Sequence, residues 1–342
     1  MEIANIDSIT FDIANKKHIR VYYQTKDKKL RETSYESGSG WFVRHGAIIA
    51  ENAMANTPIT AARWVDGDMA HIRVYYLNDA RQICESKGEH NSSTGITAWQ
   101  SGVPLQLNKA TNVGSGSSLA VARPDRNDAT LRIFYQEGKS PTNGNTCPIR
   151  EIKYRKVQNK WVYQNSMITD ALEYTRFTAV SAGKTGTVRV YYQGSDSFLR
   201  VTLWDSDAGN WKTSKRANED NKLAPRAPIK ALAWYGSESY DVDDLRVRVY
   251  TILASSPKHL YEFARNGEDW DEPTPIADNQ QVTSENWSIG VCRERTFNDD
   301  APIFVFFKPR PDYVDFVFPQ VGAALTTQVQ DSFRPHGIPV SL

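Results

Sequence analysis

The chain has few of the features that mark nucleic-acid-binding, membrane-spanning or disulfide-rich proteins. Its 41 basic and 40 acidic residues leave a net charge of +1, so no basic excess would attract nucleic acid or anionic lipid. It has no apolar run of the roughly 18 residues that a transmembrane helix needs. The three cysteines, Cys84, Cys147 and Cys292, are odd in number and widely spaced, which argues against a disulfide framework or a cysteine zinc site.

Signals for export and for cofactors are also missing. The opening MEIANIDSIT has neither a basic segment nor an apolar core, so we expect no secretory signal peptide. The protein is therefore expected to be cytoplasmic or released without a signal peptide. The six histidines are scattered, and no glycine-rich phosphate loop stands between a strand and a helix. We expect no metal and no cofactor.

The sequence does contain one phrase that returns along the whole chain. HIRVYYQ at 18–24 is followed by HIRVYYL at 71–77, LRIFYQ at 131–136, VRVYYQ at 188–193, VRVYT at 247–251 and IFVFF at 303–307. The central residues of these copies are Arg20, Arg73, Arg132, Arg189, Arg248 and Phe304, at steps of 53, 59, 57, 59 and 56 residues. Six units of nearly constant length therefore fill the chain.

Each unit has the composition of four short strands. Small and apolar residues precede the phrase, an alternating run follows it, and a short polar link then leads to a tryptophan in most units. Period-two alternation, β-branched and aromatic residues and frequent turn residues indicate strands. Six such units predict an all-β fold, a six-bladed β-propeller with four antiparallel strands per blade. The small-residue run suits the innermost strand, where blades converge.

Residues 1–342 are expected to form this propeller as a single domain, with 328–342 as either a last strand or a tail. The alternative is a pair of stacked β-sandwiches, but a sandwich does not require six units of equal length. Closing the units into a ring also removes exposed sheet edges.

The arginine in each apolar strand needs a partner, because a buried charge is costly unless it is paired. The next predicted strand supplies a glutamate in four units, giving the pairs Arg20–Glu32, Arg73–Glu85, Arg132–Glu151 and Arg248–Glu262. A cross-strand ion pair that merely repeats is one interpretation, but exposed pairs contribute only about 0–1 kcal/mol. We favour a sugar site, because arginine offers donors, glutamate offers acceptors and aromatic rings cover the C–H face of a sugar.

The combined pattern I-R-V-Y-Y-Q, L-R-E-x-x-Y and G-x-G-W resembles the Aleuria-type fungal fucose lectins and their bacterial relatives over essentially the whole chain. The resemblance implies a six-bladed propeller that binds L-fucose in pockets between neighbouring blades. It also implies that arginine and glutamate of one blade hydrogen-bond the sugar, while aromatic residues of the next blade pack on its methyl group and apolar face.

Carried over to this sequence, the resemblance implies unequal sites. Two are complete: one contains Arg73, Glu85, Tyr154 and Trp161, and the other contains Arg132, Glu151, Trp204 and Trp211. Two are degenerate: Arg20, Glu32 and Trp99 have Gly88 in place of one wall, and Arg248 and Glu262 face only Tyr313 and Phe316. Two are lost: Val201 replaces the glutamate that would pair with Arg189, and Phe304 replaces the arginine beside Tyr35 and Trp41.

Two other classes of function remain open at this stage. Sialidases are also six-bladed, and residues 205–211 loosely match their Asp-box turn, but a hydrolase needs one unique set of acid–base residues. A protein-interaction propeller of the WD or kelch type would carry those motifs, which are absent here. We therefore expect a protein that is not an enzyme and whose partners are fucosylated glycans and glycoproteins, without nucleic acid or membrane insertion. The resemblance also implies that it can form a homodimer.

Overall fold

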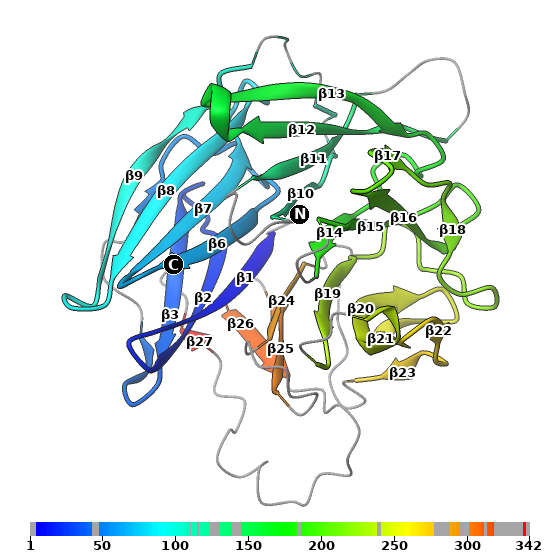
Figure 1. The fold of residues 1–342 in the computed structure, drawn as a ribbon. Coiled ribbons are helices and arrows are strands. Elements are labelled where there is room, and N and C mark those ends of the chain that lie inside the picture. The colour runs from blue at the N-terminus through cyan, green and yellow to red at the C-terminus, as the bar shows by residue number, and fades with distance from the viewer. Residues whose placement is uncertain are drawn as a thin grey trace, which may run out of the picture.

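The chain folds as an all-β propeller whose blades are antiparallel sheets (Figure 1). The computed structural model describes residues 5–42, 48–107, 109, 111, 113–114, 116–123, 130–138, 145–182, 186–237, 241–276, 288–293, 301–310, 313–317 and 338–339. The described strands group into six sheets that follow one another along the chain, and we number these sheets one to six.

Each sheet is built from consecutive strands. Sheet one contains β1 (Ile6–Ile13), β2 (Lys16–Gln24), β3 (Leu30–Glu36), β4 (Gly40–Phe42) and β5 (Ile48–Ala50). Sheet two contains β6 (Thr60–Asp66), β7 (Met69–Leu77), β8 (Ile83–Asn91) and β9 (Ile96–Pro104). Sheet three contains β10 (Leu119–Ala122), β11 (Arg132–Gln136), β12 (Ile149–Arg155) and β13 (Lys160–Ile168). A 3-10 turn, η1 (Lys156–Gln158), joins β12 to β13.

The remaining three sheets follow the same plan. Sheet four contains β14 (Phe177–Ser181), β15 (Val188–Gln193), β16 (Leu199–Asp205), β17 (Asn210–Trp211) and β18 (Lys215–Arg216). Sheet five contains β19 (Lys230–Tyr235), β20 (Leu245–Leu253), β21 (Ser256–Asn266), β22 (Asp269–Trp270) and β23 (Thr274–Pro275), with η2 (Val242–Asp244) before β20. Sheet six contains β24 (Ile289–Arg293), β25 (Ile303–Arg310), β26 (Tyr313–Val317) and β27 (Ile338–Pro339).

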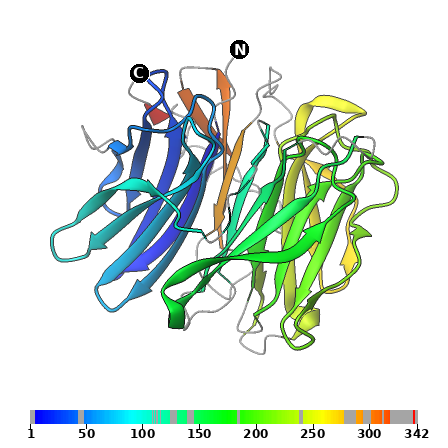
Figure 2. The same ribbon diagram turned by 90° about the horizontal axis from the view of Figure 1, so that it is seen from above.

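The first strand of every sheet lies on the inside of a ring. β1 contacts β6, β6 contacts β10, and the series continues through β14, β19 and β24 back to β1. These strands carry small side chains where they meet, as in Leu-Ala-Val-Ala of β10 and Phe-Thr-Ala-Val-Ser of β14. Figure 1 shows the sheets around the ring, and Figure 2 shows them after a quarter turn. The small-residue runs therefore form the inner strands, as the sequence predicts.

The ring closes between β1 and β24 without a shared ladder among the described strands. The backbone N–H of Ile6 donates to Oγ of Ser288 at 2.5 Å, and the hydroxyl of Thr10 donates to the carbonyl oxygen of Arg293 at 2.5 Å. β1 pairs with β2 of its own sheet, and β27 pairs with β26. Of the predicted tail, only Ile338–Pro339 lies within the described residues, and it forms β27.

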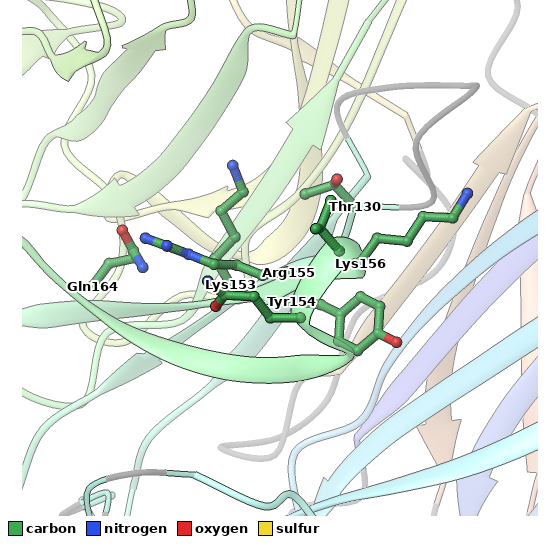
Figure 3. Close-up of a pocket in the computed structure, with 8 residues that line it drawn as sticks. Thr130, Lys153, Tyr154, Arg155, Lys156 and Gln164 are labelled. Atoms are coloured by element: carbon green, nitrogen blue, oxygen red, sulfur yellow. The ribbon is translucent and has the colours of Figure 1, made fainter.

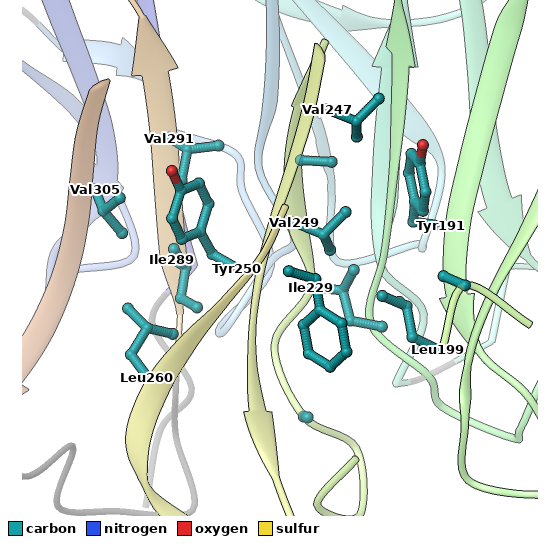
Figure 4. Close-up of a cluster of buried hydrophobic side chains, with 14 of the residues drawn as sticks. Tyr191, Leu199, Ile229, Val247, Val249, Tyr250, Leu260, Ile289, Val291 and Val305 are labelled. Carbon is teal, nitrogen blue, oxygen red and sulfur yellow. The ribbon is translucent and has the colours of Figure 1, made fainter. Parts of the chain in front are cut away.

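The repeated phrase forms the second strand of each sheet and supplies much of the core. In β15 every residue of VRVYYQ is buried, and β20 is buried over Val247–Leu253. Buried side chains of neighbouring sheets pack together: Tyr191 of β15, Val249 of β20 and Val291 of β24 belong to one hydrophobic cluster (Figure 4). Burial of such large side chains stabilises each one by about 1.5–3 kcal/mol.

In three of the six copies the phrase ends in a glutamine that joins its sheet to the next. Its side-chain nitrogen donates to a backbone carbonyl of the segment that leads into the following sheet. The bonds run from Gln24 to Met54 (2.8 Å), from Gln136 to Leu172 (2.8 Å) and from Gln193 to Leu223 (3.3 Å). These copies thus end in glutamine because that side chain satisfies buried backbone groups between sheets.

Three sheets have a fifth short strand, which the four-strand prediction missed. β4 and β5 both pair with β3, β17 and β18 with β16, and β22 and β23 with β21. In sheets four and five the two short outer strands are separated by a few residues that lie outside the ladder. The outer edge of these sheets is therefore split into two pieces.

Candidate functional site at the sheet seams

The arginine and glutamate positions occupy the second and third strands of a sheet at a fixed offset. The residue two places after the arginine pairs directly with the glutamate. The paired residues are Tyr22 and Glu32, Tyr75 and Glu85, Phe134 and Glu151, and Tyr250 and Glu262. Because alternate residues of a strand share a face, arginine and glutamate lie diagonally opposite each other on one face of the sheet.

The four expected pairs form ion pairs. The nitrogen–oxygen distances are 3.4 Å for Arg20–Glu32, 3.9 Å for Arg73–Glu85, 2.9 Å for Arg132–Glu151 and 3.4 Å for Arg248–Glu262. In Arg20, Arg132 and Arg248, the Nε atom is buried and makes no hydrogen bond. The structure thus brings together the partners that the sequence pairs, while their role in binding stays a prediction.

Two of the glutamates each accept a hydrogen bond from a tyrosine that was not among the predicted site residues. The Tyr75 hydroxyl donates to Oε1 of Glu85 at 2.7 Å, and the Tyr250 hydroxyl donates to Oε2 of Glu262 at 2.6 Å. Burial raises the pKa of both tyrosines well above the ordinary value, and the nearby carboxylate raises it further. Both hydroxyls therefore remain donors. In the VYY sequence the first tyrosine lies on the same face of the strand as the arginine, and this alternation could have predicted its contact with the glutamate.

Burial also acts on the glutamate of sheet five. It raises the pKa of Glu262, although the hydrogen bond from Tyr250 and the charge of Arg248 lower it. Arg248 donates through Nη1 to the backbone carbonyl of Val247 at 2.8 Å, and its Cζ lies 5.3 Å from the ring centroid of Trp234. This pair is therefore enclosed by its own sheet.

An edge-to-face aromatic contact marks five of the seams, where a seam is the contact between two neighbouring sheets. A tryptophan of one sheet packs on the second strand of the adjoining sheet, with centroids 5.7 to 6.1 Å apart and ring planes at 81° to 84°. The pairs are Trp99–Tyr22, Trp161–Tyr75, Trp211–Phe134, Trp270–Tyr191 and Trp41–Phe306. Such contacts are worth about 0.5–1.5 kcal/mol beyond burial. They fix each tryptophan beside the arginine and glutamate positions of the preceding sheet.

The seam between sheets three and four holds all four residues of one predicted site in contact. Cζ of Arg132 lies 4.3 Å from the ring centroid of Trp204. The Trp211 indole donates through Nε1 to Oε2 of Glu151 at 3.3 Å, while Arg132 donates through Nη1 to Oε1 of the same carboxylate at 2.9 Å. Arg132 of sheet three and Trp211 of sheet four thus converge on one carboxylate, and Trp204 lies beside the guanidinium.

The seam between sheets two and three gathers the other complete set more loosely. Trp161 packs on Tyr154 with 5.4 Å between ring centroids, and it also packs on Tyr75, whose hydroxyl holds Glu85. Arg73 lies over Trp64 of its own sheet, 4.9 Å from the ring centroid. Its side chain is 13% exposed, more than those of the other three paired arginines. This seam is therefore the more open of the two.

The seam between sheets one and two is filled where the sequence predicts a missing wall. Gly88 pairs with Trp99 on the neighbouring strand. A Cβ atom at Gly88 would lie 2.9 Å from the six-membered ring of Trp99. Glycine is thus required for Trp99 to lie across its backbone and reach Tyr22. The Arg20 and Glu32 pair behind this ring is almost wholly buried, with side chains 1% and 3% exposed.

Sheet six departs most from the pattern. Phe304 occupies the arginine position of β25, and Phe306 pairs with Phe316 at the glutamate position. By backbone register Phe316 stands at the glutamate position of its own sheet, and its predicted role as an aromatic wall opposite Arg248 and Glu262 stays a prediction. Tyr313 pairs with Pro339 at the far end of β26, and the side chains of Tyr313 and Phe316 lie outside the described residues.

Sheet four lacks its glutamate, as predicted, and its neighbour lacks an aromatic residue, which was not predicted. Val201 pairs with Tyr191, in the place where glutamate stands in other sheets. In sheet five, Arg265 pairs with Trp270, in the place that Tyr154 and Trp204 occupy opposite their own tryptophans. The seam between sheets four and five therefore contains Arg189 and Arg265.

The paired arginines lie deeper than a surface that meets a sugar directly. The side chains of Arg132 and Glu151 are only 5% and 3% exposed. The rings above them are partly exposed in the case of Tyr154, Trp204 and Trp211. A ligand at these seams would therefore meet the aromatic rings first and the ion pair beneath them.

Among the described residues, one cavity lies at the hairpin of β12 and β13 and another lies among the inner strands of the ring. The first, of about 340 Å³, is lined by Thr130, Tyr154 and a group of polar residues that includes Lys153, Arg155, Lys156 and Gln164 (Figure 3). The other, of about 20 Å³, lies between inner strands and is lined by residues such as Ile6, Ile59, Arg176 and Ile289. The arginine–glutamate pairs line neither of them, but Tyr154 belongs both to the first cavity and to a predicted sugar site.

The stretch that resembles an Asp-box forms a tight turn between β16 and β17. Oδ1 of Asp205 accepts backbone hydrogen bonds from Asp207 at 3.0 Å and Ala208 at 3.1 Å, and its carboxylate pairs with Lys212 at 2.8 Å. Aspartate commonly closes turns in this way. The likeness to a sialidase turn thus has a local structural explanation.

Metal chemistry finds no support in the described part of the chain. Among these residues, no group of three or more histidine, cysteine, aspartate or glutamate side chains could hold a metal ion. Cys84, Cys147 and Cys292 are buried and form no disulfide with one another. No helix within the described ranges is long and apolar enough to cross a membrane.

Comparison with known proteins agrees with this architecture. The chain is 24% identical over 307 residues to the fucose-specific lectin of Aleuria aurantia, covering 88% of this chain and 87% of that protein. It is 29% identical over 126 residues to the fucose-specific lectin of Aspergillus fumigatus, covering 35% of this chain and 36% of that one.

Solved structures share the fold. The Aleuria aurantia lectin superimposes with a TM-score of 0.72 at 23% identity, with 93% of each chain covered. AofleA of Arthrobotrys oligospora gives a TM-score of 0.69 at 18% identity, covering 94% of this chain and 84% of that one. The sequence model of the fungal fucose-specific lectins matches residues 3–143, which span sheets one and two and the first two strands of sheet three, β10 and β11. The chain is thus similar to the fungal fucose-specific lectins: their sequence model matches its first part, and the Aleuria lectin matches it over 88% of its length.

Proposed function

We propose that this protein is a multivalent lectin that binds L-fucose in fucosylated glycans at the seams of a six-bladed propeller. The observation that carries the proposal is the contact among Arg132, Glu151, Trp204 and Trp211, in which two sheets bring donors, acceptors and two aromatic rings together. The names of its relatives support fucose as the sugar, and an Aleuria lectin has been solved with α-methyl-L-fucoside. The six sheets of the described residues support six blades.

Each part of the constellation supplies one element of sugar recognition. The guanidinium of Arg132 donates to hydroxyl or ring oxygens, and Glu151 accepts from hydroxyl groups. The partly exposed rings of Trp204 and Trp211 cover the apolar face and the methyl group of a 6-deoxy sugar. Because arginine and glutamate already contact each other, the site is organised before the ligand arrives, which lowers the entropy cost of binding.

The seams contribute unequally to this function. Those with Arg73 and Arg132 carry both an ion pair and two aromatic residues. The seam with Arg20 is closed by Trp99. At the seam with Arg189, Val201 stands at the glutamate position. Single monosaccharide sites bind weakly, and several on one rigid ring raise avidity by about 10²–10⁴ on a surface rich in the sugar. A homodimer would raise it further, and light scattering of the purified protein tests for one.

Binding of a glycan array to purified protein tests the proposal. We expect fucosylated glycans to dominate and the double variant Arg73→Ala/Arg132→Ala to lose most of the signal. Arg155→Ala serves as the control, because Arg155 is exposed beside the cavity of Figure 3 and touches neither ion pair. Unchanged binding by the double variant, or a preference for non-fucosylated glycans, would refute the proposed sites.

A further inference from the structure

The seam between sheets four and five has the positive half of a binding site without its negative half. Arg189 stands at the arginine position of β15, and Val201 stands where four other sheets place glutamate. The Arg189 side chain is buried, with the residue 8% exposed, and its Nη1 atom makes no hydrogen bond. An unpaired buried guanidinium is costly, which implies that an acceptor belongs here.

A second donor at the same seam also lacks an acceptor. The Tyr191 hydroxyl is fully buried and makes no hydrogen bond. Its equivalents Tyr75 and Tyr250 donate to Glu85 and Glu262, whereas the buried Tyr22 hydroxyl makes no hydrogen bond. Both Arg189 and Tyr191 thus point to the same absent group, a carboxylate near the Cβ of Val201.

The adjoining sheet adds a second cation. Arg265 occupies the position that holds Tyr154 and Trp204 elsewhere, and its positive charge acts on Arg189. Burial is the main reason why the pKa of Arg189 is lowered; Arg265 lowers it further, whereas Tyr191 and Tyr235 raise it. Two arginines that repel each other beside an empty acceptor position favour a negatively charged ligand.

The aromatic wall of a sugar site is still present. Trp270 packs edge-to-face on Tyr191 with 6.1 Å between centroids, as the tryptophans do at four other seams. Its ring is partly exposed, and Arg265 lies opposite it on the adjacent strand. Figure 4 shows Tyr191 on β15 facing the cluster that Val247 and Val249 of β20 form.

We propose that this seam binds a carboxylate-bearing pyranose, such as a hexuronic acid, whose carboxylate takes the place of the missing glutamate between Arg189 and Arg265. Trp270 covers the sugar face, and Tyr191 donates a further hydrogen bond to the carboxylate. The inference rests on the proposed function in one respect, namely that seams of this propeller hold sugars. It assigns to one seam a ligand class distinct from fucose.

Three glycosides that differ only at C6 test this assignment by calorimetric titration of the full-length protein. They are methyl β-D-glucuronide, the neutral methyl β-D-glucoside and its 6-sulfate. We expect the glucuronide to bind about tenfold or more tightly than the glucoside, because only it satisfies the buried donors. Equal binding of glucuronide and glucoside, no binding of the glucuronide, or tighter binding of the sulfate would overturn the carboxylate assignment.

Variants locate the site and separate it from the fucose sites. Val201→Glu supplies the carboxylate internally and should weaken glucuronide binding about tenfold or more, as should Arg189→Ala. Arg265→Ala provides a third variant if Arg189→Ala does not fold. Titration of each variant with α-methyl-L-fucoside reads the seams at Arg73 and Arg132 independently. Glucuronide binding that survives Val201→Glu and Arg265→Ala contradicts the inference. If the wild-type protein does not bind the fucoside, only the proposed function is contradicted.

Discussion

The indole of Trp211 donates a hydrogen bond across a seam to the carboxylate of Glu151, 60 residues earlier in the chain. The other oxygen of that carboxylate accepts from Arg132. Trp211 also packs edge-to-face on Phe134, which pairs with Glu151 in the ladder. The Glu151 carboxylate therefore accepts hydrogen bonds from both sheets and lies beside the packed rings of Phe134 and Trp211.

The buried pair at this point separates a binding role from a stabilising one. We expect Arg132→Met/Glu151→Leu to retain stability within about 1 kcal/mol, because apolar replacements of a buried ion pair are often neutral or better. The same protein should lose fucoside binding at that seam. Urea unfolding and calorimetric titration with α-methyl-L-fucoside measure the two effects.

Single replacement at the same pair gives the matching control. Glu151→Gln leaves Arg132 buried without its counter-charge and should cost about 3–5 kcal/mol of unfolding free energy. A double variant that unfolds as readily as this single variant, or that still binds at full strength, would show the pair to be structural.

Two equivalent tyrosines at different seams, Tyr75 and Tyr191, should respond oppositely to loss of the hydroxyl. Tyr75→Phe removes a hydrogen bond to Glu85 and should destabilise the fold by about 1–2 kcal/mol. Tyr191→Phe removes a buried hydroxyl that has no acceptor and should leave stability unchanged or raise it by about 1 kcal/mol. Sheet three carries Phe134 at this position, so phenylalanine fits the site. Denaturant midpoints of the two variants compare them, and equal losses would be inconsistent with the prediction.

Gly88→Ala should destabilise the seam between sheets one and two. The added Cβ would lie 2.9 Å from the Trp99 ring, so either the ring or the strand must shift. Such overpacking costs about 1–3 kcal/mol. Lys87→Ala, one residue away with a side chain 44% exposed, should change the unfolding free energy by less than about 1 kcal/mol. Chemical unfolding of both variants tests this, and the idea fails if they unfold alike.

His18 should make the protein sensitive to acid. Burial and the charge of Arg20 lower its pKa from 6.5 to about 4, against a smaller opposing effect of Glu36. The native state therefore holds His18 neutral while the unfolded chain binds a proton below pH 6.5. Stability from this group is present above that pH and is lost as pH falls toward 4.

His18→Phe removes this dependence while keeping a ring that can stack on Phe11, which lies 4.8 Å from His18 between centroids. The wild type should lose more unfolding free energy than the variant between pH 7 and pH 4.5. Thermal unfolding at both pH values measures the difference, and parallel losses in the two proteins would count against His18 as the titrating group.

The repeat was enough to predict the strands, the propeller and the partners of the buried arginines. The alternation around Arg20 and Glu32 is local, so hairpin geometry alone brings the two together. Val201 was recognised as the missing glutamate because it stands at a fixed offset from Arg189. The fold and half of each site therefore follow from spacing within one unit.

Features that depend on which residues pair across strands, or on packing between sheets, escaped prediction. Arg265 occupies an aromatic position, but the sequence pattern of this unit identifies only Trp270 and not the residue that pairs with it. The role of Gly88 became visible only when Trp99 was seen across its backbone. The depth of the arginines is likewise set by packing of neighbouring sheets, which no residue pattern within a single strand encodes.

Every seam is assembled from two successive repeat units, so the residues of one seam come from both units. One copy donates the polar half, and the following copy donates the flat half. Sheet four illustrates the outcome: Trp204 and Trp211 still serve the polar residues before them, although Val201 has altered the seam that comes after. In a repeat protein of this kind, a substitution in one unit can change the ligand preference of one seam while the neighbouring seam stays intact.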